Sequence, residues 1–271
     1  MSPAVAVGLD GSPESLAAAD WAACEALLRG TELRIVHAAD QPPQEHVPLG
    51  HRGHMLLQVQ TALTARHADL KVAVHQIPGP SAVALSAAAD EAGLLVLGTR
   101  GPGRAAGLLL GSVARAVVAR ARQPVVLVRA GDSATETHPD SPLGTASGTT
   151  CRDVVVGLDP RAPHDAVLQV AFDAASRRAA ALRVVHGRND PADPALAAAL
   201  RAWRERFPDV EVSEQAVIGT AGSHLTDASR DASLVVVGRR SRPASVGPHI
   251  GPVTHAVLRH ALAPVVVVPH D

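Results

Sequence analysis

Apolar residues along this chain gather in short runs of strand length. In the first half they cover 4–9, 32–37, 71–77, 94–98 and 124–128, and each run is rich in Val, Ile and Leu at successive positions. Strands that are apolar on both faces are typical of a parallel sheet with helices on each side. The pattern therefore predicts five buried parallel strands.

Segments with helical periodicity separate most of these runs. The first begins after Ser12-Pro13, where a serine can cap the helix and proline suits the first helical position. Further helices are expected near 55–68, from Ser81 to about Ala92, and from Ser112 onward. Strands and helices that alternate with loops of this length predict a doubly wound α/β domain.

The whole pattern occurs twice. VAVGLDGS at 5–12 returns as VVVGLDPR at 154–161, and LRIVHA at 33–38 returns as LRVVHG at 182–187. The two later strands repeat as well, after a deletion in the second copy that the alignment places near 40–55. A repeat of this length indicates tandem domains rather than a solenoid, whose period is about 20–50 residues.

The copies define the expected domain organisation. We predict one domain over 1–130, a flexible linker rich in Ser, Thr, Gly, Pro and Asp over 131–150, and a second domain over 151–271. Each copy ends in a wholly apolar strand, PVVLV or PVVVV, and such a strand needs cover if it lies at a sheet edge. We expect the two domains to pair about a pseudo-two-fold axis, with pairing between chains of a homodimer as the alternative.

Charge and composition narrow the classes of partner. The formal net charge is -1, and with no Tyr, two Phe and two Trp the chain offers little for stacking on bases. The apolar runs are too short for a transmembrane helix, and the N-terminus lacks the features of a secretory signal. Cys24 and Cys151 form neither a disulfide framework nor a metal spacing. We therefore expect a cytoplasmic protein that binds neither nucleic acid nor membranes.

Candidate binding residues follow the strands of the first copy. Ligands of open α/β sheets bind beyond the carboxyl ends of the strands, so Leu9–Ser12, His37-Ala38 and 98–112 should converge. Glycines can take positive φ and turn amides toward an anion, and Gly111-Ser112 opens a helix whose free N–H groups favour phosphate. Asp10 suits ribose hydroxyls or an adenine amino group, or it serves only the turn.

The glycine spacing shows which of the known nucleotide-binding motifs the chain matches. The P-loop is absent, and a near match to the Rossmann fingerprint at Gly101-x-Gly103 follows the fourth strand rather than the first. Gly98-x2-Gly101-x9-Gly111-Ser112 instead has the G-2x-G-9x-G-[S/T] spacing of the universal stress protein family. With VGLDGS after the first strand and VHA after the second, the chain resembles the tandem form of that family.

The resemblance implies a parallel sheet of order 3-2-1-4-5 in each domain and binding of ATP, usually with Mg2+. By this likeness Asp10 contacts adenosine, the backbone of Leu9 and Ala38 contacts adenine, and the motif glycines line ribose and phosphates. No side chain is assigned to the metal. The ATP-binding set expected in the first domain is Leu9, Asp10, Ala38, Gly98, Thr99, Arg100, Gly101, Gly103, Gly111, Ser112 and Val113.

The second copy departs from the motif. Ser241 replaces the second glycine and Pro252 replaces the serine, which removes an N–H and a hydroxyl at a cost of roughly 3 kcal/mol, or ~100-fold in affinity. Arg239 and Arg240 could compensate, so ATP binding in this domain stays open. The corresponding set is Leu158, Asp159, Gly187, Gly238, Arg239, Arg240, Ser241, Gly251, Pro252 and Val253.

Three functions remain open at this point: a nucleotide-dependent stress or signalling module, a slow ATPase or phosphotransferase, and a dimeric scaffold without ligand. Hydrolysis needs charge stabilisers and a positioned water. Arg100 and Arg104 could stabilise charge, but no credible base is present, so we expect at most weak hydrolysis.

The remaining conspicuous residues are expected to be structural. His46, His51 and His54 are assigned to a solvated loop rather than a metal site. The arginines on helices should lie on solvated faces and the apolar stripe of the second domain in the core. These two groups are Arg177, Arg178, Arg201, Arg204 and Arg206, and Leu196, Leu200, Trp203 and Phe207.

Overall fold

The computed structural model describes residues 3–39, 51–99, 110–130, 152–162, 164–187, 194–241 and 249–271. The chain divides into two compact units, Met1–Ala134 and Thr135–Asp271, here called domain 1 and domain 2. The proposed linker, the loop histidine His46 and the predicted site residues Arg100, Gly101 and Gly103 fall outside the described ranges. The prediction that His51 and His54 lie in the same loop is wrong, because the helix expected near 55–68 begins earlier, at His51.

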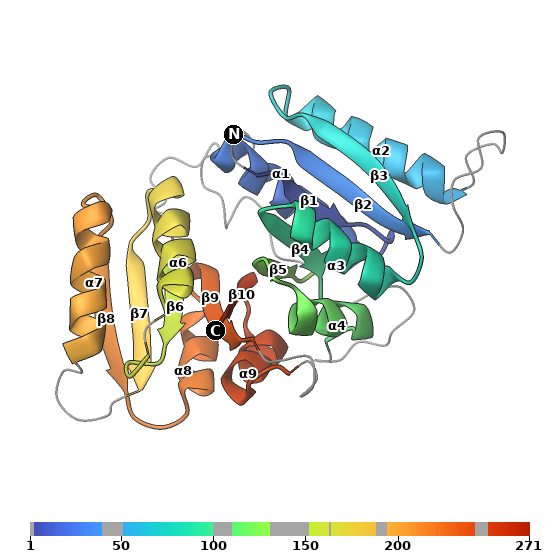
Figure 1. Ribbon diagram of the computed structural model, residues 1–271. Helices are drawn as coiled ribbons and strands as arrows, with labels where there is room; N and C mark the ends of the chain where they lie inside the picture. The colour runs from blue at the N-terminus through green and yellow to red at the C-terminus, as the bar shows by residue number, and fades with distance from the viewer. Residues whose placement is uncertain are drawn as a thin grey trace. The chain divides into compact units, whose positions relative to one another are not determined.

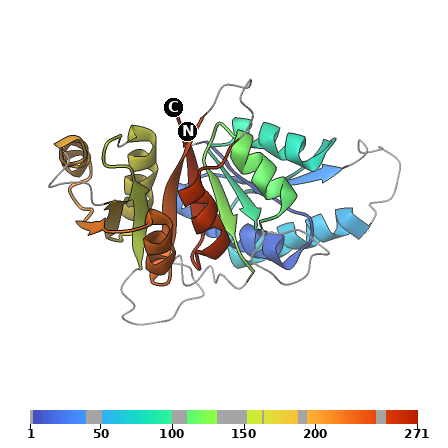
Figure 2. The ribbon, with the colours of Figure 1, turned by 90° about the horizontal axis from the view of Figure 1, so that it is seen from below.

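Domain 1 is a five-stranded parallel sheet between two layers of helices (Figure 1). The strand order is β3-β2-β1-β4-β5. Helices α1 and α2 cover one face and α3 and α4 the other, as the second view shows (Figure 2). The strands are β1 Val5–Gly8, β2 Leu33–Ala39, β3 Val72–Pro78, β4 Leu94–Gly98 and β5 Val125–Val128; the helices are α1 Pro13–Arg29, α2 His51–Arg66, α3 Ser81–Glu91 and α4 Ser112–Arg120.

Domain 2 repeats this arrangement. Its parallel strands follow the order β10-β9-β6-β7-β8, with α6 and α7 on one face and α8 and α9 on the other (Figure 2). The predicted α/β class is confirmed in both domains. The strands are β6 Asp153–Leu158, β7 Leu182–Gly187, β8 Val212–Val217, β9 Ala232–Arg240 and β10 Val265–His270; the helices are α6 Asp165–Arg177, α7 Pro194–Arg206, α8 Ala221–Ala228 and α9 Pro252–His260.

Local sequence explains where the first helix begins and ends. The Ser12 side chain accepts a hydrogen bond from the Ser15 N–H at 3.2 Å, and Pro13 occupies the first helical position. Gly30 ends the helix with φ of 60°, and its N–H bonds to the carbonyls of the preceding turn. Ser12 therefore caps α1 as its sequence predicts.

The core consists mainly of the apolar strands. β1, β4 and β5 are buried along almost their whole length, because helices cover both faces of the sheet. In domain 2 the predicted stripe on α7 is also core: Leu196, Leu200 and Trp203 are buried, and Phe207 stacks on Trp203. No helix within the described ranges is both long and apolar enough to cross a bilayer.

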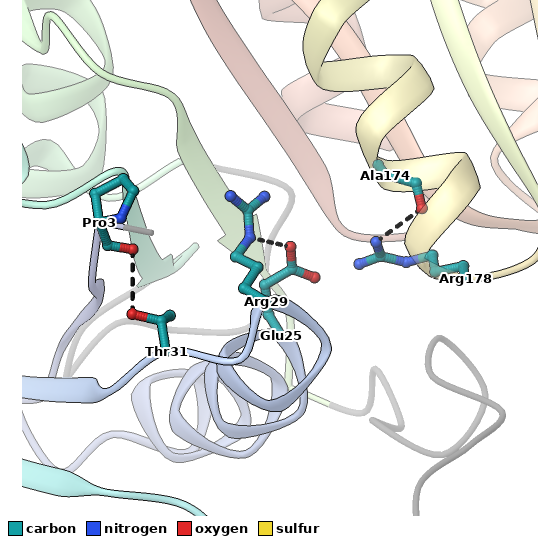
Figure 3. A network of polar contacts seen from close by, with 6 residues as sticks. All are labelled: Pro3, Glu25, Arg29, Thr31, Ala174 and Arg178. Atoms are coloured by element: carbon teal, nitrogen blue, oxygen red, sulfur yellow. Dashed lines mark hydrogen bonds and ion pairs between the residues drawn. The ribbon is translucent and has the colours of Figure 1, made fainter. Parts of the chain in front are cut away.

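One arginine expected at the surface is buried. Arg178, at the end of α6, is 1% exposed and donates from Nη1 to the carbonyl of Ala174 at 3.2 Å. The arginine at the equivalent place in domain 1, Arg29, instead pairs with the buried carboxylate of Glu25 at 2.6 Å (Figure 3). Helical periodicity alone did not predict the burial of Arg178, because a guanidinium can be buried when backbone carbonyls accept hydrogen bonds from it.

Candidate functional site

In domain 1, three predicted segments meet at the carboxyl edge of the sheet. The N–H of Leu9 bonds to the carbonyl of Val36 at 2.9 Å, which joins the segment after β1 to β2. His37 Nδ1 lies 2.7 Å from the carbonyl oxygen of Leu9. The segment after β4 is held in place by a 2.9 Å bond from the N–H of Thr99 to Val128. The ends of β1, β2 and β4 are neighbours, because β1 pairs with β2 on one side and with β4 on the other.

The turn after β1 carries Asp10 in an exposed position. Its Oδ1 accepts two hydrogen bonds from Ser12, one from the N–H at 2.9 Å and one from the hydroxyl at 2.6 Å. Ser15 supports the same turn by accepting from the N–H of Gly11 at 3.1 Å. Asp10 thus shapes the turn through one carboxylate oxygen and leaves the carboxylate accessible for a ligand.

Gly98 has a packing role that its place in the motif did not reveal. A Cβ on this residue would lie 2.7 Å from the backbone carbonyl carbon of Glu14 in the first turn of α1. The positive φ expected for the motif glycines is absent at both described positions, since Gly98 continues β4 and Gly111 has φ of -60°. Gly98 is glycine because a helix crosses it closely.

Among the described residues, no side chain caps helix α4, which begins at this edge. Gly111 is its N-cap residue, and the N–H of Gly111 donates to the carbonyl of Thr99 at 2.8 Å. Ser112 is exposed and Val113 partly so. Thr99 is 5% exposed, and within the described part its hydroxyl has no hydrogen-bond partner. Free amides at a helix start and an unsatisfied hydroxyl beside them suit an anion.

The corresponding edge of domain 2 contains a cavity of about 520 Å³. A volume of this size suits a small-molecule ligand. Every residue predicted for the second site lines the cavity except Ser241, whose N–H is instead bonded to the His270 carbonyl. The predicted residues in its wall are Leu158, Asp159, Gly187, Gly238, Arg239, Arg240, Gly251, Pro252 and Val253.

Two histidines that the sequence reading missed also line this cavity. The rings of His164 and His270 stack with centroids 3.7 Å apart and an interplanar angle of 27°. A Cβ on Gly238 would lie 2.8 Å from Nε2 of His270, so the glycine leaves room for this ring. Burial is the main cause that lowers the pKa of His270, and the nearby His164, Arg240 and Arg239 lower it further, while a 3.1 Å bond to the Asp271 carbonyl opposes them.

The arginines of the wall differ in exposure. Arg239 is 6% exposed and Arg240 lies at the surface. Burial lowers the pKa of Arg239, but a guanidinium stays charged at neutral pH. The hydroxyl of Thr254 donates to the carbonyl of Gly238 at 2.8 Å, and this bond ties the first turn of α9 to the end of β9. Within the described ranges, no side chain caps α9.

Metal-binding side chains do not gather at either site in the described ranges. Among those residues, no group of three or more His, Cys, Asp or Glu is arranged to hold an ion. A divalent ion that accompanied a nucleotide there would depend on the phosphates for most of its ligands.

Comparison with known proteins fits this architecture. The model of the universal stress protein family matches residues 1–129 and 192–269. The chain belongs to the universal stress protein family. Two universal stress proteins of Mycobacterium tuberculosis are similar to it along almost their whole length: one is 33% identical over 97% of this chain and 96% of its own, the other 31% over 98% and 96%.

Solved structures show the same fold. A universal stress protein from Archaeoglobus fulgidus superposes over 100% of both chains with a TM-score of 0.75 and 19% identity. The tandem arrangement of two α/β units is therefore shared by a structure with little sequence likeness.

The two histidines could have been found by aligning the copies of this universal stress protein. The first offset between the copies, 149, is that of Asp10 and Asp159, and it places His164 opposite the buried Ser15. The later offset, 140, is that of Gly98 and Gly238, and it places His270 opposite Ala130. Both positions adjoin the strand ends that bind ligands in this fold. Histidines that occur in only one copy, next to these strand ends, were therefore the sequence signal that could have predicted them as site residues.

Proposed function

We propose that this universal stress protein binds ATP at domain 1, with Mg2+ on the phosphates, and acts as a nucleotide-dependent stress or signalling module. The observation that carries the proposal is the convergence of the Asp10 turn, the His37-Ala38 backbone and the uncapped start of α4 at one sheet edge. These are the acceptor, the backbone edge and the amide donors that a nucleotide requires.

Each group has a distinct role in this proposal. The N–H groups of Ser112 and Val113 and the Ser112 hydroxyl bind phosphate oxygens, because the helix start leaves them without intrahelical partners. The Asp10 carboxylate accepts from ribose hydroxyls, and the backbone at Ala38 binds the edge of the base. Thr99 offers the hydroxyl that lacks a partner within the described part.

The same residues give little support to rapid turnover. Hydrolysis needs a base or a residue that orients water beside the terminal phosphate. Of the described titratable groups at this edge, His37 is buried against the Leu9 carbonyl, and Asp10 is assigned in this proposal to the ribose rather than to the terminal phosphate. We therefore favour binding without appreciable hydrolysis.

The test begins with the protein as purified. Mass spectrometry and absorbance of material released by heat denaturation should identify an adenine nucleotide, and added ATP with Mg2+ should raise the thermal unfolding temperature. An absence of both effects would favour a scaffold without ligand. A subsequent ADP-release assay should detect at most slow turnover; appreciable turnover that is lost in Asp10→Ala would favour an enzyme.

A further inference from the structure

The cavity of domain 2 carries an excess of positive charge. Its described wall contains Arg239 and Arg240 against a single carboxylate, that of Asp159. Two helices also begin there, α6 after His164 and α9 after Gly251, and no described side chain caps either of them. The positive ends of helices add to the field of the arginines, so the cavity favours an anion.

Stacked histidines face this positive field from two elements. His164 precedes α6 and His270 ends β10, and both rings line the cavity. Other charged or titratable groups around them are the arginines and Asp159 just described, the exposed His249 before α9, and Asp165 in the first turn of α6, whose carboxylate accepts from Trp203. Asp271, which follows His270 and whose main-chain oxygen bonds to the His270 ring, is exposed and adds a third carboxylate. These three aspartates are the described acidic groups that oppose the positive charge.

Without a ligand the His270 ring should be largely neutral at pH 7. Burial lowers the pKa of His270, and the nearby His164 and both arginines lower it further. Two protonated rings with centroids 3.7 Å apart would repel each other, so the pair accepts one proton far more readily than two. A bound anion would reverse the sign of the local field and favour that proton.

We propose that this cavity binds a phosphate-bearing anion together with one proton, which the stacked pair His164 and His270 accepts. Arginine side chains and free helix amides are typical partners of phosphate oxygens. Since proton uptake accompanies binding, affinity rises as pH falls, by up to about tenfold per pH unit while one proton is taken up. Domain 1 has Ser15 and Ala130 at the equivalent positions, so its site lacks this coupling.

Nuclear magnetic resonance of the full-length protein can test this site directly. The imidazole signals of His164 and His270 are followed between about pH 5.5 and about pH 8, alone and with saturating tripolyphosphate or ATP. We expect either probe to raise the pKa of at least one ring by about one unit. Signals that do not move with millimolar probe, or pKa values unchanged at saturation, would overturn the proposal.

Variants then assign the proton to the pair. In His270→Gln, affinity read from the His164 signal should depend less steeply on pH than in wild type. The titration of the probe itself is the same in both proteins, so the difference in steepness reports the proton taken up by the pair. His255→Gln, on the exposed side of α9 and outside the cavity wall, is the matched control and should behave as wild type. Equal pH dependence in wild type and His270→Gln would overturn the assignment.

The two probes also identify the source of the phosphate. Tighter binding of ATP supports a nucleotide, and equal binding of tripolyphosphate supports a free polyphosphate; both support an anion site. The result is independent of ATP binding at domain 1, because the signals and the variants belong to domain 2 alone.

Discussion

Equivalent glycines of the motif have different neighbours in the two domains. Gly98 lies against the backbone of α1, whereas Gly238 leaves space for the ring of His270. The same residue type therefore allows close helix packing in domain 1 and makes room for a side chain in the cavity wall of domain 2. Substitutions at these positions should report on stability as well as on binding.

Gly98→Ala should destabilise domain 1. The added methyl would lie 2.7 Å from the backbone carbonyl carbon of Glu14, which cannot move without displacing α1. We expect a loss of about 1–3 kcal/mol in the free energy of unfolding, measured by urea denaturation. Gly187→Ala is the control, because a Cβ there meets nothing within 4 Å, and it should stay within about 0.5 kcal/mol of wild type. Equal effects of the two changes would contradict the packing role.

The pH dependence of stability should depend on His67. This buried residue follows α2, and burial, with a smaller effect of Arg66, lowers its pKa from 6.5, while Asp20 opposes the shift. The unfolded chain therefore binds a proton more readily than the folded domain, so the free energy of unfolding is highest above pH 6.5 and falls as the pH decreases below it.

Urea denaturation at about pH 7.5 and about pH 5.5 would measure this effect. His67→Gln should lose less stability between these values than wild type, and His54→Gln, on the exposed face of α2, should not differ from it. Equal losses of stability in all three proteins would contradict this role of His67.

At the scale of elements, the starts of α4 and α9 separate the two domains. Both helices follow an N-cap glycine with φ near -60°, and in the part of the chain that the structure describes neither has a side-chain cap. They differ at the next residue, where Ser112 offers an N–H and a hydroxyl and Pro252 offers neither. The two helices thus begin with the same backbone geometry but offer different hydrogen-bond donors to an anion.

Ser112→Pro should therefore weaken ATP binding without unfolding α4. Proline is compatible with the first helical position, and the loss of two donors is expected to lower affinity about 100-fold. Isothermal titration calorimetry with ATP and Mg2+ measures the change, and thermal unfolding checks the fold. Ser81→Pro, at the exposed start of α3, provides the control and should bind as wild type. If Ser112→Pro bound ATP as tightly as wild type, the first residue of α4 would not contribute to phosphate binding.

Sequence patterns predicted the elements better than their contacts. Buried strands and the cap at Ser12 follow from local composition, because apolar runs and capping residues act within a few positions. The stacking of His164 on His270 joins segments far apart in the chain, and the approach of α1 to Gly98 depends on how a helix crosses a strand. Neither leaves a periodic signal in the sequence.

For the whole molecule, the tandem repeat provides two versions of one site. Domain 1 keeps the glycine and serine spacing of the motif, whereas domain 2 combines arginines with a histidine pair around its cavity. A single chain would then have two anion sites that differ in their response to pH. Binding studies that treat the protein as one site would average the two.

The most direct measurement of the central claim is a crystal structure of this protein grown with excess ATP and Mg2+. We predict that the triphosphate of one nucleotide lies against the amides of Ser112 and Val113, with the ribose beside Asp10 and the base near Ala38. A structure in which ATP is absent from this edge of domain 1, or in which side chains fill it, would contradict the account.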